Sequence, residues 1–282
     1  MANMSQSKFD ALYTLMKGEW GTRKSTCSLT YPGPIYYIDW DKKMKALHIP
    51  MRAWGIDPRT IEYDSYKDWD APRQKLEQFQ VNCKFKTIVI DTITSGADSI
   101  NRQTLQNKGK DDKGKRIGGI PVNSIEDYNA EDSALKELIA LTKDIHLYHK
   151  CNIILIAHVI QKEIKTAGGT HMARLLVTAG KGIAQKIPGY CDEIYHFNII
   201  PEVDTSKEPN YTLRTTHTGD DYARTSLPLQ SQIVFNNRPL YPDFIKPAVD
   251  KMNNQILEEQ AHEKSKDTSN VVPMKPLDMG PK

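Results

Sequence analysis

Short runs of apolar and β-branched residues recur along the chain, and each run is followed by polar residues. The runs cover residues 11–16, 35–38, 85–90, 151–159 and 194–199. Runs with so little polar alternation are typical of parallel strands that are buried on both faces of a sheet. Helical segments are expected between them, at 71–80 and, with apolar residues at helical spacing, at 124–149. The pattern predicts an α/β domain with a mostly parallel sheet flanked by helices.

The first apolar run leads into a stretch with the spacing of a phosphate-binding loop. In order, it contains Gly18, Glu19, Trp20, Gly21, Thr22, Arg23, Lys24, Ser25 and Thr26. The usual pattern is Gly, four residues, then Gly-Lys-Ser/Thr, and Arg23 stands where the second glycine is expected. In such a loop, backbone N–H groups and the start of the next helix bind phosphate. We therefore expect Lys24 to reach the terminal phosphates and the Ser25 hydroxyl to bind Mg²⁺.

Arg23 is the unusual position of this loop. Gly18 and Gly21 supply the permissive backbone dihedral angles of a tight turn, whereas Arg23 requires a long side chain to leave a crowded turn. The arginine also adds a cation near the phosphates. The following helix is expected from Lys24 to about Thr30. The alternative is a surface loop before a helix that happens to contain glycine and lysine.

Polar residues with possible chemical roles follow three of the expected strands. Asp39 and Asp41 follow the second run, and Asp91 follows the third. Asp91 is expected to hold Mg²⁺ beside the loop. Asp39 or Asp41 could orient the water that attacks a γ-phosphate, or could simply cap a turn. His158, after the fourth run, could sense the γ-phosphate or could be a capping or core histidine.

Two basic, glycine-containing stretches, 105–119 and 161–179, break the pattern of strands and helices. We expect both to be irregular loops that contact a DNA backbone, because their cations could follow a line of phosphates. The candidate DNA-binding residues are Lys108, Lys110, Lys113, Lys115, Arg116, Lys162, Lys165 and Arg174. The alternative for the first stretch is a solvated insertion whose own acidic residues dilute its charge.

The composition sets limits on the class of protein. The net charge of the 282 residues is only +3, so any nucleic-acid contact has to come from local patches. Four scattered cysteines without a CxxC pair favour reduced thiols in the cytoplasm, and no apolar stretch suggests a membrane contact. One domain is expected over residues 1–245, with a hairpin formed by 211–216 and 221–224. The charged residues 246–282 are expected to be a disordered tail, apart from a possible helix near 252–262.

The motifs together resemble those of phage-encoded RecA-like nucleotide-binding proteins, an AAA-type group linked to phage recombination and single-strand annealing. The resemblance rests on 18–26, 38–41, 88–91, 153–158 and 187–194. It implies a RecA-like core with ATP and Mg²⁺ at the carboxyl ends of the strands. It also implies that Lys24, Ser25 and Asp91 bind phosphate and Mg²⁺, and that Asp41 is a catalytic carboxylate in place of a glutamate. By the same resemblance, His158 would be a sensor of the γ-phosphate. The two basic stretches would be DNA-binding loops, and Arg224 would be a basic finger that reaches the nucleotide of a neighbouring subunit.

The resulting hypothesis is a cytoplasmic ATP-dependent DNA-binding protein of a phage-infected cell. Its partner is expected to be DNA, more often single-stranded, and the resemblance suggests a homo-oligomer with nucleotide near the subunit interface. Arg23 and Asp41 depart from the usual pattern. The first alternative is therefore a protein that binds nucleotide without hydrolysing it and acts as a scaffold or annealing factor. A nucleotide kinase shares the phosphate-binding loop and is the second, although no acceptor-binding signature is present.

Overall fold

The described part of the chain alternates between strands and helices in a computed structural model. It covers residues 8–110, 116–117, 120–121, 125–166, 169–176, 181–202, 204, 206, 208–218 and 221–269. The strands are β1 (Tyr13–Gly18), β2 (Ile35–Asp39), β3 (Ile61–Asp64), β4 (Thr87–Asp91), β5 (Arg116–Ile117), β6 (Ile120–Pro121), β7 (Asn152–Thr166), β8 (Gly169–Leu176), β9 (Glu193–Ile200), β10 (Asn210–Arg214) and β11 (Gln232–Val234). The helices are α1 (Lys24–Ser28), α2 (His48–Ala53), α3 (Asp70–Val81), α4 (Ile93–Lys110), α5 (Ile125–His149), α6 (Lys181–Tyr190) and α7 (Lys246–Ser269), with short turns η2 (Met44–Leu47), η3 (Pro58–Thr60) and η4 (Tyr241–Ile245).

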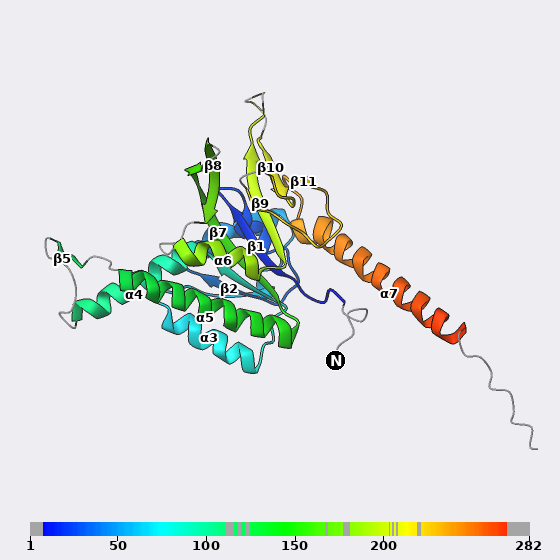
Figure 1. Cartoon of the computed structure of the whole chain (residues 1–282), viewed down its shortest axis with the longest axis horizontal. Coiled ribbons are helices and arrows are strands. Elements are labelled where there is room, and N and C mark those ends of the chain that lie inside the picture. The colour runs from blue at the N-terminus through cyan, green and yellow to red at the C-terminus, as the bar shows by residue number, and fades with distance from the viewer. Residues whose placement is uncertain are drawn as a thin grey trace, which may run out of the picture.

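The main sheet has the strand order β11-β10-β9-β1-β7-β4-β2-β3, and β8 pairs with the far part of β7. The six strands from β9 to β3 in this order are parallel to one another, and β10 is antiparallel to both of its neighbours, β9 and β11. Figure 1 shows α3, α4 and α5 beside the sheet and α7 pointing away from the body of the molecule. The predicted α/β class, with a mostly parallel sheet flanked by helices, is confirmed, and its central order is β9-β1-β7-β4-β2.

The central strands bury both faces because alternate side chains point into two apolar layers. In β1, Leu15 belongs to the layer that contains side chains of α3, α4, α5 and α6. The next residue, Met16, belongs to the opposite layer, with side chains of α1, α2 and the start of α7. Ile90 and Val89 of β4 divide in the same way between the two layers. This arrangement explains why the strands appear in the sequence as continuous apolar runs.

The carboxyl ends of the central strands meet at one edge of the sheet. Gly18, at the end of β1, is in register with His158 of β7. Asp39, at the end of β2, is in register with Asp91 of β4. Open α/β sheets bind their ligands at this edge. The register therefore brings the loop after β1 and the polar residues predicted from the sequence to the same part of the molecule.

The first basic stretch is more regular than predicted. Its first part, 105–110, is not irregular, because α4 continues through Lys110. The helix is anchored by the buried Ile93, Ala97 and Ile100 and extends beyond that anchor, where the glycine and lysine content had suggested a loop. Positions 111–115 and 118–119 lie outside the described residues.

The second basic stretch, predicted to be a loop, forms an antiparallel β7–β8 hairpin over 152–166 and 169–176. Lys162 pairs with Ala173 and Lys165 pairs with Thr170. The prediction was wrong here because the β-branched Ile160, Ile164 and Thr166 around the lysines supply the strand propensity that extends β7. Residues 167–168 and 177–180 lie outside the described part.

The hairpin predicted between 211–216 and 221–224 is also wrong, although its turn exists. Thr218 and Asp221 exchange two backbone hydrogen bonds, with N···O distances of 3.2 and 2.9 Å. The chain after this turn does not return along β10, which instead pairs with β9 and β11. Arg224 forms an antiparallel bridge with Ile194 near the start of β9. β10 covers only the later part of β9, so the backbone groups of Ile194 are free to bond Arg224.

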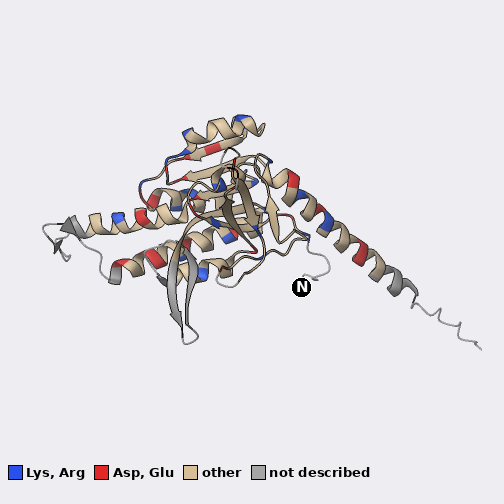
Figure 2. Ribbon diagram, turned by 90° about the horizontal axis from the view of Figure 1, so that it is seen from above, with Lys and Arg blue, Asp and Glu red and all other residues tan. Residues whose placement is uncertain are grey.

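The expected disordered tail begins with a long helix, α7, so the boundary at residue 245 is wrong. Ala248 and Val249 in its first turns are buried in the core. The Asn253 side chain accepts a hydrogen bond from the backbone N–H of Phe9 at 2.8 Å. These contacts fix the start of a helix whose charged composition alone suggested disorder. Figure 2 shows acidic and basic residues interspersed along α7. Residues 270–282 lie outside the described part.

Two further findings concern the described residues only. None of their helices combines the length and the hydropathy that a membrane crossing requires. Their His, Cys, Asp and Glu side chains form no cluster of three or more that could hold a metal ion.

Candidate nucleotide-binding site

The backbone of the loop between β1 and α1 depends on residues with positive φ. Gly18 has φ 157°, and a Cβ atom there would lie 2.4 Å from the carbonyl oxygen of Phe197 in β9, so that only glycine fits. Gly21 has φ 77°. Arg23, directly before α1, has φ 64° and ψ 18°, which is the left-handed conformation. The arginine thus adopts a conformation that glycine reaches more easily, at a cost of about 1–2 kcal/mol.

The Arg23 side chain leaves the loop toward β10 and the segment after β11. Its Nη1 atom donates hydrogen bonds to the carbonyl oxygen of Asn236 (2.6 Å) and to Oδ1 of Asn237 (2.9 Å). The guanidinium carbon lies 3.7 Å from the centre of the Tyr211 ring. These contacts offset the strain of the backbone. They also hold the arginine charge on the β10–β11 side of the loop.

We expect Arg23→Gly to change ATP affinity by less than about threefold, because the loop already has the backbone that glycine would give it. The lost contacts with Tyr211 and Asn236 should lower the free energy of unfolding by about 1 kcal/mol after relief of the φ strain. Isothermal titration calorimetry and urea unfolding measure the two effects. A hundredfold gain in affinity would contradict this expectation and identify the native loop as blocked.

Lys24 lies inside the loop, as predicted. Its Nζ atom donates hydrogen bonds to the carbonyl oxygens of Gly18 (2.9 Å) and Glu19 (2.7 Å) and to the hydroxyl of Thr22 (3.1 Å). Burial lowers the pKa of Lys24 to about 8, and the charge of Asp91 opposes that shift. A bound phosphate would favour the ammonium form in the same way. Without ligand, the lysine is therefore held by loop carbonyl groups at the place where phosphate is expected.

Ser25 and Asp91 form a hydrogen-bonded pair beside Lys24, and their expected role in holding Mg²⁺ stays a prediction. The Ser25 hydroxyl donates to Oδ2 of Asp91 at 2.7 Å, and the Tyr37 hydroxyl donates to the same oxygen. The buried Oδ1 atom of Asp91 has no hydrogen-bond partner among the described residues. Burial, reinforced by the charges of Asp41 and Asp39, raises the pKa of Asp91 to about 6. A hydroxyl and a carboxylate with a free oxygen are suitable ligands for Mg²⁺, so the residues fit that ion.

The raised pKa of Asp91 should make the stability of the ligand-free protein depend on pH. Its pKa of about 6 in the folded state exceeds the value of 3.8 expected when unfolded. Between these values the folded state binds more protons, so the free energy of unfolding falls as pH rises. Relative to Asp91→Asn, we expect the free energy of unfolding of the wild type to fall by about 2 kcal/mol between about pH 4 and pH 7. Urea unfolding of both proteins without Mg²⁺ measures this, and parallel pH profiles would contradict it.

The structure gives Asp39 and Asp41 different roles. The Asp39 carboxylate accepts hydrogen bonds from the backbone N–H groups of Lys43 (3.0 Å) and Met44 (3.1 Å), so it caps the turn after β2. Asp41 accepts from Nζ of Lys43 at 2.7 Å and from the Ser95 hydroxyl. Burial opposes ionisation of Asp41, but these hydrogen bonds outweigh burial and lower its pKa. The ionised Asp41 is therefore the better candidate for orienting a water molecule.

His158 lies beneath an exposed aromatic residue of the loop. The rings of His158 and Trp20 are stacked, with centroids 4.7 Å apart and planes 19° from parallel, and Trp20 is 57% exposed. Burial and the charge of Lys24 lower the pKa of His158 to about 4, so its ring is neutral at pH 7. The backbone N–H of His158 donates to the Thr94 hydroxyl at 3.2 Å. His158 is in register with Gly18 at the start of the loop, and its sensing role stays a prediction.

Arg224 does not lie with the other candidates. Its guanidinium donates to the carbonyl oxygen of Cys191 and, at 3.4 Å, to the Tyr222 hydroxyl. Its bridge partner Ile194 is level with Leu15, which lies about 10 Å before the end of β1. Within its own chain, Arg224 is thus separated from the phosphate-binding loop. Its expected role toward a neighbouring subunit stays a prediction.

The DNA-binding candidates are placed only by their backbones. Lys108 and Lys110 lie at the end of α4, and Arg116 lies in β5. On the β7–β8 hairpin are Lys162, Lys165 and Arg174. Lys113 and Lys115 lie outside the described residues. The candidates thus belong to two separate projections of the chain, and their contact with DNA stays a prediction.

Sequence reasoning missed two hydroxyl groups that hold the acidic residues of the site. Tyr37 donates to Asp91, and Ser95 donates to Asp41. Neither belongs to a motif. The strand register could have identified Tyr37. Tyr37 pairs with Val89 of β4, and Asp91 follows Val89 by two residues, so the side chains of Tyr37 and Asp91 lie on the same side of the sheet. That signal requires knowing that β2 and β4 are neighbours.

A buried ionic cluster next to the loop was missed as well. The Oδ1 atom of Asp221 lies 2.7 Å from Nζ of Lys17. Its Oδ2 atom lies 3.1 Å from Nδ1 of His196 and also contacts the guanidinium of Arg214. Lys17, His196 and Arg214 are cross-strand neighbours on β1, β9 and β10. The cluster ties the turn at 218–221 to the residue that precedes Gly18. Breaking a buried ion pair of this kind typically costs about 3–5 kcal/mol.

These features define a P-loop NTPase core. The model of an AAA domain family, AAA_24, matches residues 12–227, and the chain belongs to this family. Among solved structures, a KaiC-like protein from the hyperthermophilic archaeon Pyrococcus horikoshii OT3 matches with 13% identity and a TM-score of 0.43, over 79% of this chain and 89% of the other. No curated protein matches the sequence.

Proposed function

We propose that this protein binds ATP with Mg²⁺, hydrolyses it, and uses the cycle to control binding to DNA in phage recombination, annealing or replication. The observation that carries the proposal is the pair formed by Ser25 and Asp91 beside the buried Lys24. The pair leaves one buried carboxylate oxygen of Asp91 without a partner among the described residues, at the place where a nucleotide-bound cation would lie.

Each residue of the site would have a separate part in hydrolysis. Lys24 would exchange its loop carbonyl groups for phosphate oxygens, and Ser25 with Asp91 would hold Mg²⁺, which offsets the charge of the phosphates. Asp41 would orient a water molecule for in-line attack on the γ-phosphorus atom and accept its proton. The bond from that phosphorus to the β–γ bridging oxygen would break, giving ADP and inorganic phosphate. His158, which is neutral at pH 7, would respond to the γ-phosphate by hydrogen bonding and not by charge.

The DNA-binding part of the proposal is supported by the course of β7. This strand carries His158 at the level of the loop and continues into the hairpin with Lys162 and Lys165. Together with the resemblance to phage recombination proteins, this course favours single-stranded DNA and a homo-oligomer with nucleotide near its interface. If the basic residues bind phosphates, DNA affinity should fall steeply as the salt concentration rises. A plot of the logarithm of the binding constant against the logarithm of the salt concentration should have a negative slope that grows with the number of phosphates contacted.

The test is ATP turnover and ATP binding by the purified full chain with Mg²⁺, with and without single-stranded DNA. Turnover that DNA stimulates would support the whole proposal. Binding without turnover would favour the non-hydrolysing scaffold or annealing factor, and turnover only with a nucleoside acceptor would favour the kinase. Absence of ATP binding would refute the proposal, whatever the DNA result.

A further inference from the structure

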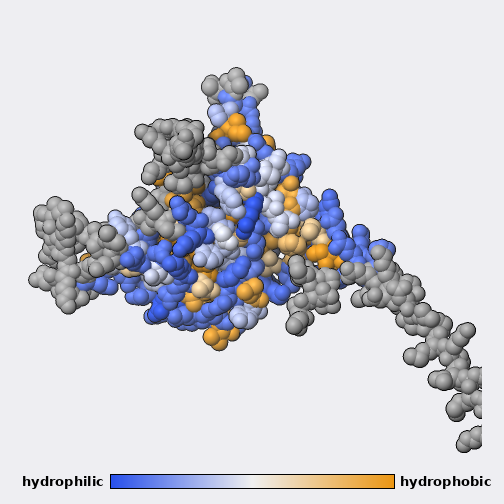
Figure 3. Space-filling model, in the orientation of Figure 1, coloured by the Kyte–Doolittle hydropathy of each residue, from blue (hydrophilic) through white to orange (hydrophobic). Residues whose placement is uncertain are grey.

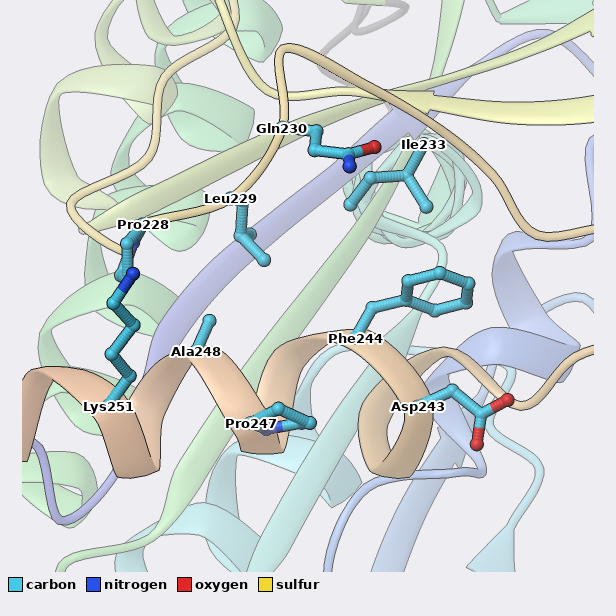
Figure 4. A pocket seen from close by; sticks show the side chains of 9 residues that line it. All are labelled: Pro228, Leu229, Gln230, Ile233, Asp243, Phe244, Pro247, Ala248 and Lys251. Carbon is cyan, nitrogen blue, oxygen red and sulfur yellow. The ribbon is translucent and has the colours of Figure 1, made fainter.

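A pocket of about 270 Å³ lies at the base of α7, far along the chain from the nucleotide site. Leu229 and Ile233, before and within β11, form one wall, and Phe244 and Ala248 of η4 and α7 form the other. Figure 4 shows these side chains facing one another across the opening. Figure 3 shows that apolar residues also reach the surface where α7 leaves the body. The pocket therefore fits a small apolar group from outside.

Two charged residues mark the ends of this pocket, Asp243 and Lys251 (Figure 4). They are separated by eight helical positions, or about 12 Å along the axis. The Oδ2 atom of Asp243 already accepts a hydrogen bond from Nε of Arg238 at 2.9 Å. Lys251 is exposed and forms no ion pair with any described residue. An occupant with apolar groups beside a carboxylate would thus satisfy both the walls and Lys251.

The sequence after α7 contains such a segment, Lys275-Pro276-Leu277-Asp278. Its two apolar residues stand between a cation and an anion, and the charged residues are about 10 Å apart when the segment is extended. That spacing approaches the distance between Asp243 and Lys251.

The tail of the same chain is too short to fill its own pocket. Ala248, in the pocket wall, lies 21 helical positions before Ser269, which places it about 32 Å from the end of α7. Leu277 follows Ser269 by eight residues, which span at most about 28 Å even when fully extended. Folding back would need additional length for a turn. The segment has to come from another molecule.

We propose that the segment 275–278 of a second copy of this chain binds the pocket, with Pro276 and Leu277 between the apolar walls and Asp278 beside Lys251. Each copy offers one segment and one pocket, which are different surfaces, so the contact is heterologous and joins copies head to tail. The contact involves none of the nucleotide-site residues. It therefore exists whether or not the chain binds ATP or DNA.

Sedimentation velocity of the full chain without nucleotide or DNA tests the proposal. We expect concentration-dependent association with a dissociation constant of about 10–100 µM, as suits a short segment in a small pocket. Leu277→Glu should weaken this association at least about tenfold, because it places a charge between apolar walls. A wild-type chain that stays monomeric at about 300 µM overturns the proposal, and the pocket then suits a segment of a different protein. Association that survives Leu277→Glu unchanged also overturns it.

A charge exchange tests the partner of Lys251. Lys251→Glu and Asp278→Lys should each weaken association about threefold to tenfold, and the double variant should recover most of the loss. Lys86→Glu is the matched control, because Lys86 is exposed, does not line the pocket, and undergoes the same change of charge. Circular dichroism of every variant establishes that the fold is retained. Failure of the double variant to recover overturns the proposed orientation of the segment.

Discussion

Replacing Lys24 by alanine is expected to weaken ATP binding by at least about 100-fold. The ammonium group contacts the carbonyl oxygens of Gly18 and Glu19 inside the loop, whereas the guanidinium of Arg23 is held outside it against Tyr211. Removal of the ammonium group would leave the phosphates with the backbone N–H groups of the loop and the Mg²⁺ that Ser25 and Asp91 would hold. Isothermal titration calorimetry with ATP and Mg²⁺ measures the loss, and hydrolysis should fall with binding.

The control for this variant is Lys45→Ala, which removes an exposed lysine of η2 and should leave ATP affinity unchanged. Lys24→Ala should also remain folded, because the lost ammonium contacts are made to a surface loop and not to the core. A thermal melt establishes this. An unchanged ATP affinity in folded Lys24→Ala would refute the assignment of this segment as a phosphate-binding loop.

Asp41→Asn is expected to lower the rate of ATP hydrolysis by about 100-fold or more while changing ATP affinity by less than about threefold. The asparagine keeps the size of the side chain and its contact with Ser95, but it cannot accept a proton from the attacking water. Single-turnover hydrolysis and calorimetry separate the two quantities. Loss of binding and turnover in equal measure would show that Asp41 holds the nucleotide and does not act on the water.

Asp39→Asn is the matched control for Asp41→Asn. Its carboxylate caps the turn after β2 through the backbone of Lys43 and Met44. The substitution should therefore lower the free energy of unfolding by about 1 kcal/mol and leave the rate of the folded enzyme within about threefold of wild type. If Asp39→Asn abolishes turnover and Asp41→Asn does not, the roles of the two residues are exchanged.

The sequence was sufficient to predict a mostly parallel sheet and three of the residues that meet at its carboxyl edge. Lys24, Ser25 and Asp91 meet as expected because the loop and the strand before Asp91 each have a strong local signal. The loop has the spacing of a motif, and the strand is an apolar run that ends in an acidic residue. The same reasoning could not separate Asp39 from Asp41. Only the turn after β2 decides which carboxylate faces backbone N–H groups and which faces Ser95.

The failures come from contacts between distant parts of the chain. The conformation of Arg23 is sustained by Tyr211 and Asn236, which follow it by about two hundred positions. The 221–224 segment pairs with Ile194 and not with β10, although a hairpin with β10 is the more local choice. The β7–β8 hairpin was hidden for another reason, because glycine and lysine suggested irregular backbone where the intervening β-branched residues extend a strand.

β7 is a single strand from the buried centre of the sheet to Thr166, and its second half projects beyond the main sheet with only β8 as partner. From His158 to Thr166 the chain advances about 26 Å. The projecting half acts as a lever arm whose pivot is at the nucleotide site. A tilt of about 10° at His158, too small to disturb the packing beneath it, would displace the tip by about 5 Å. Small rearrangements around Trp20 and His158 are thus magnified at the far end of the hairpin.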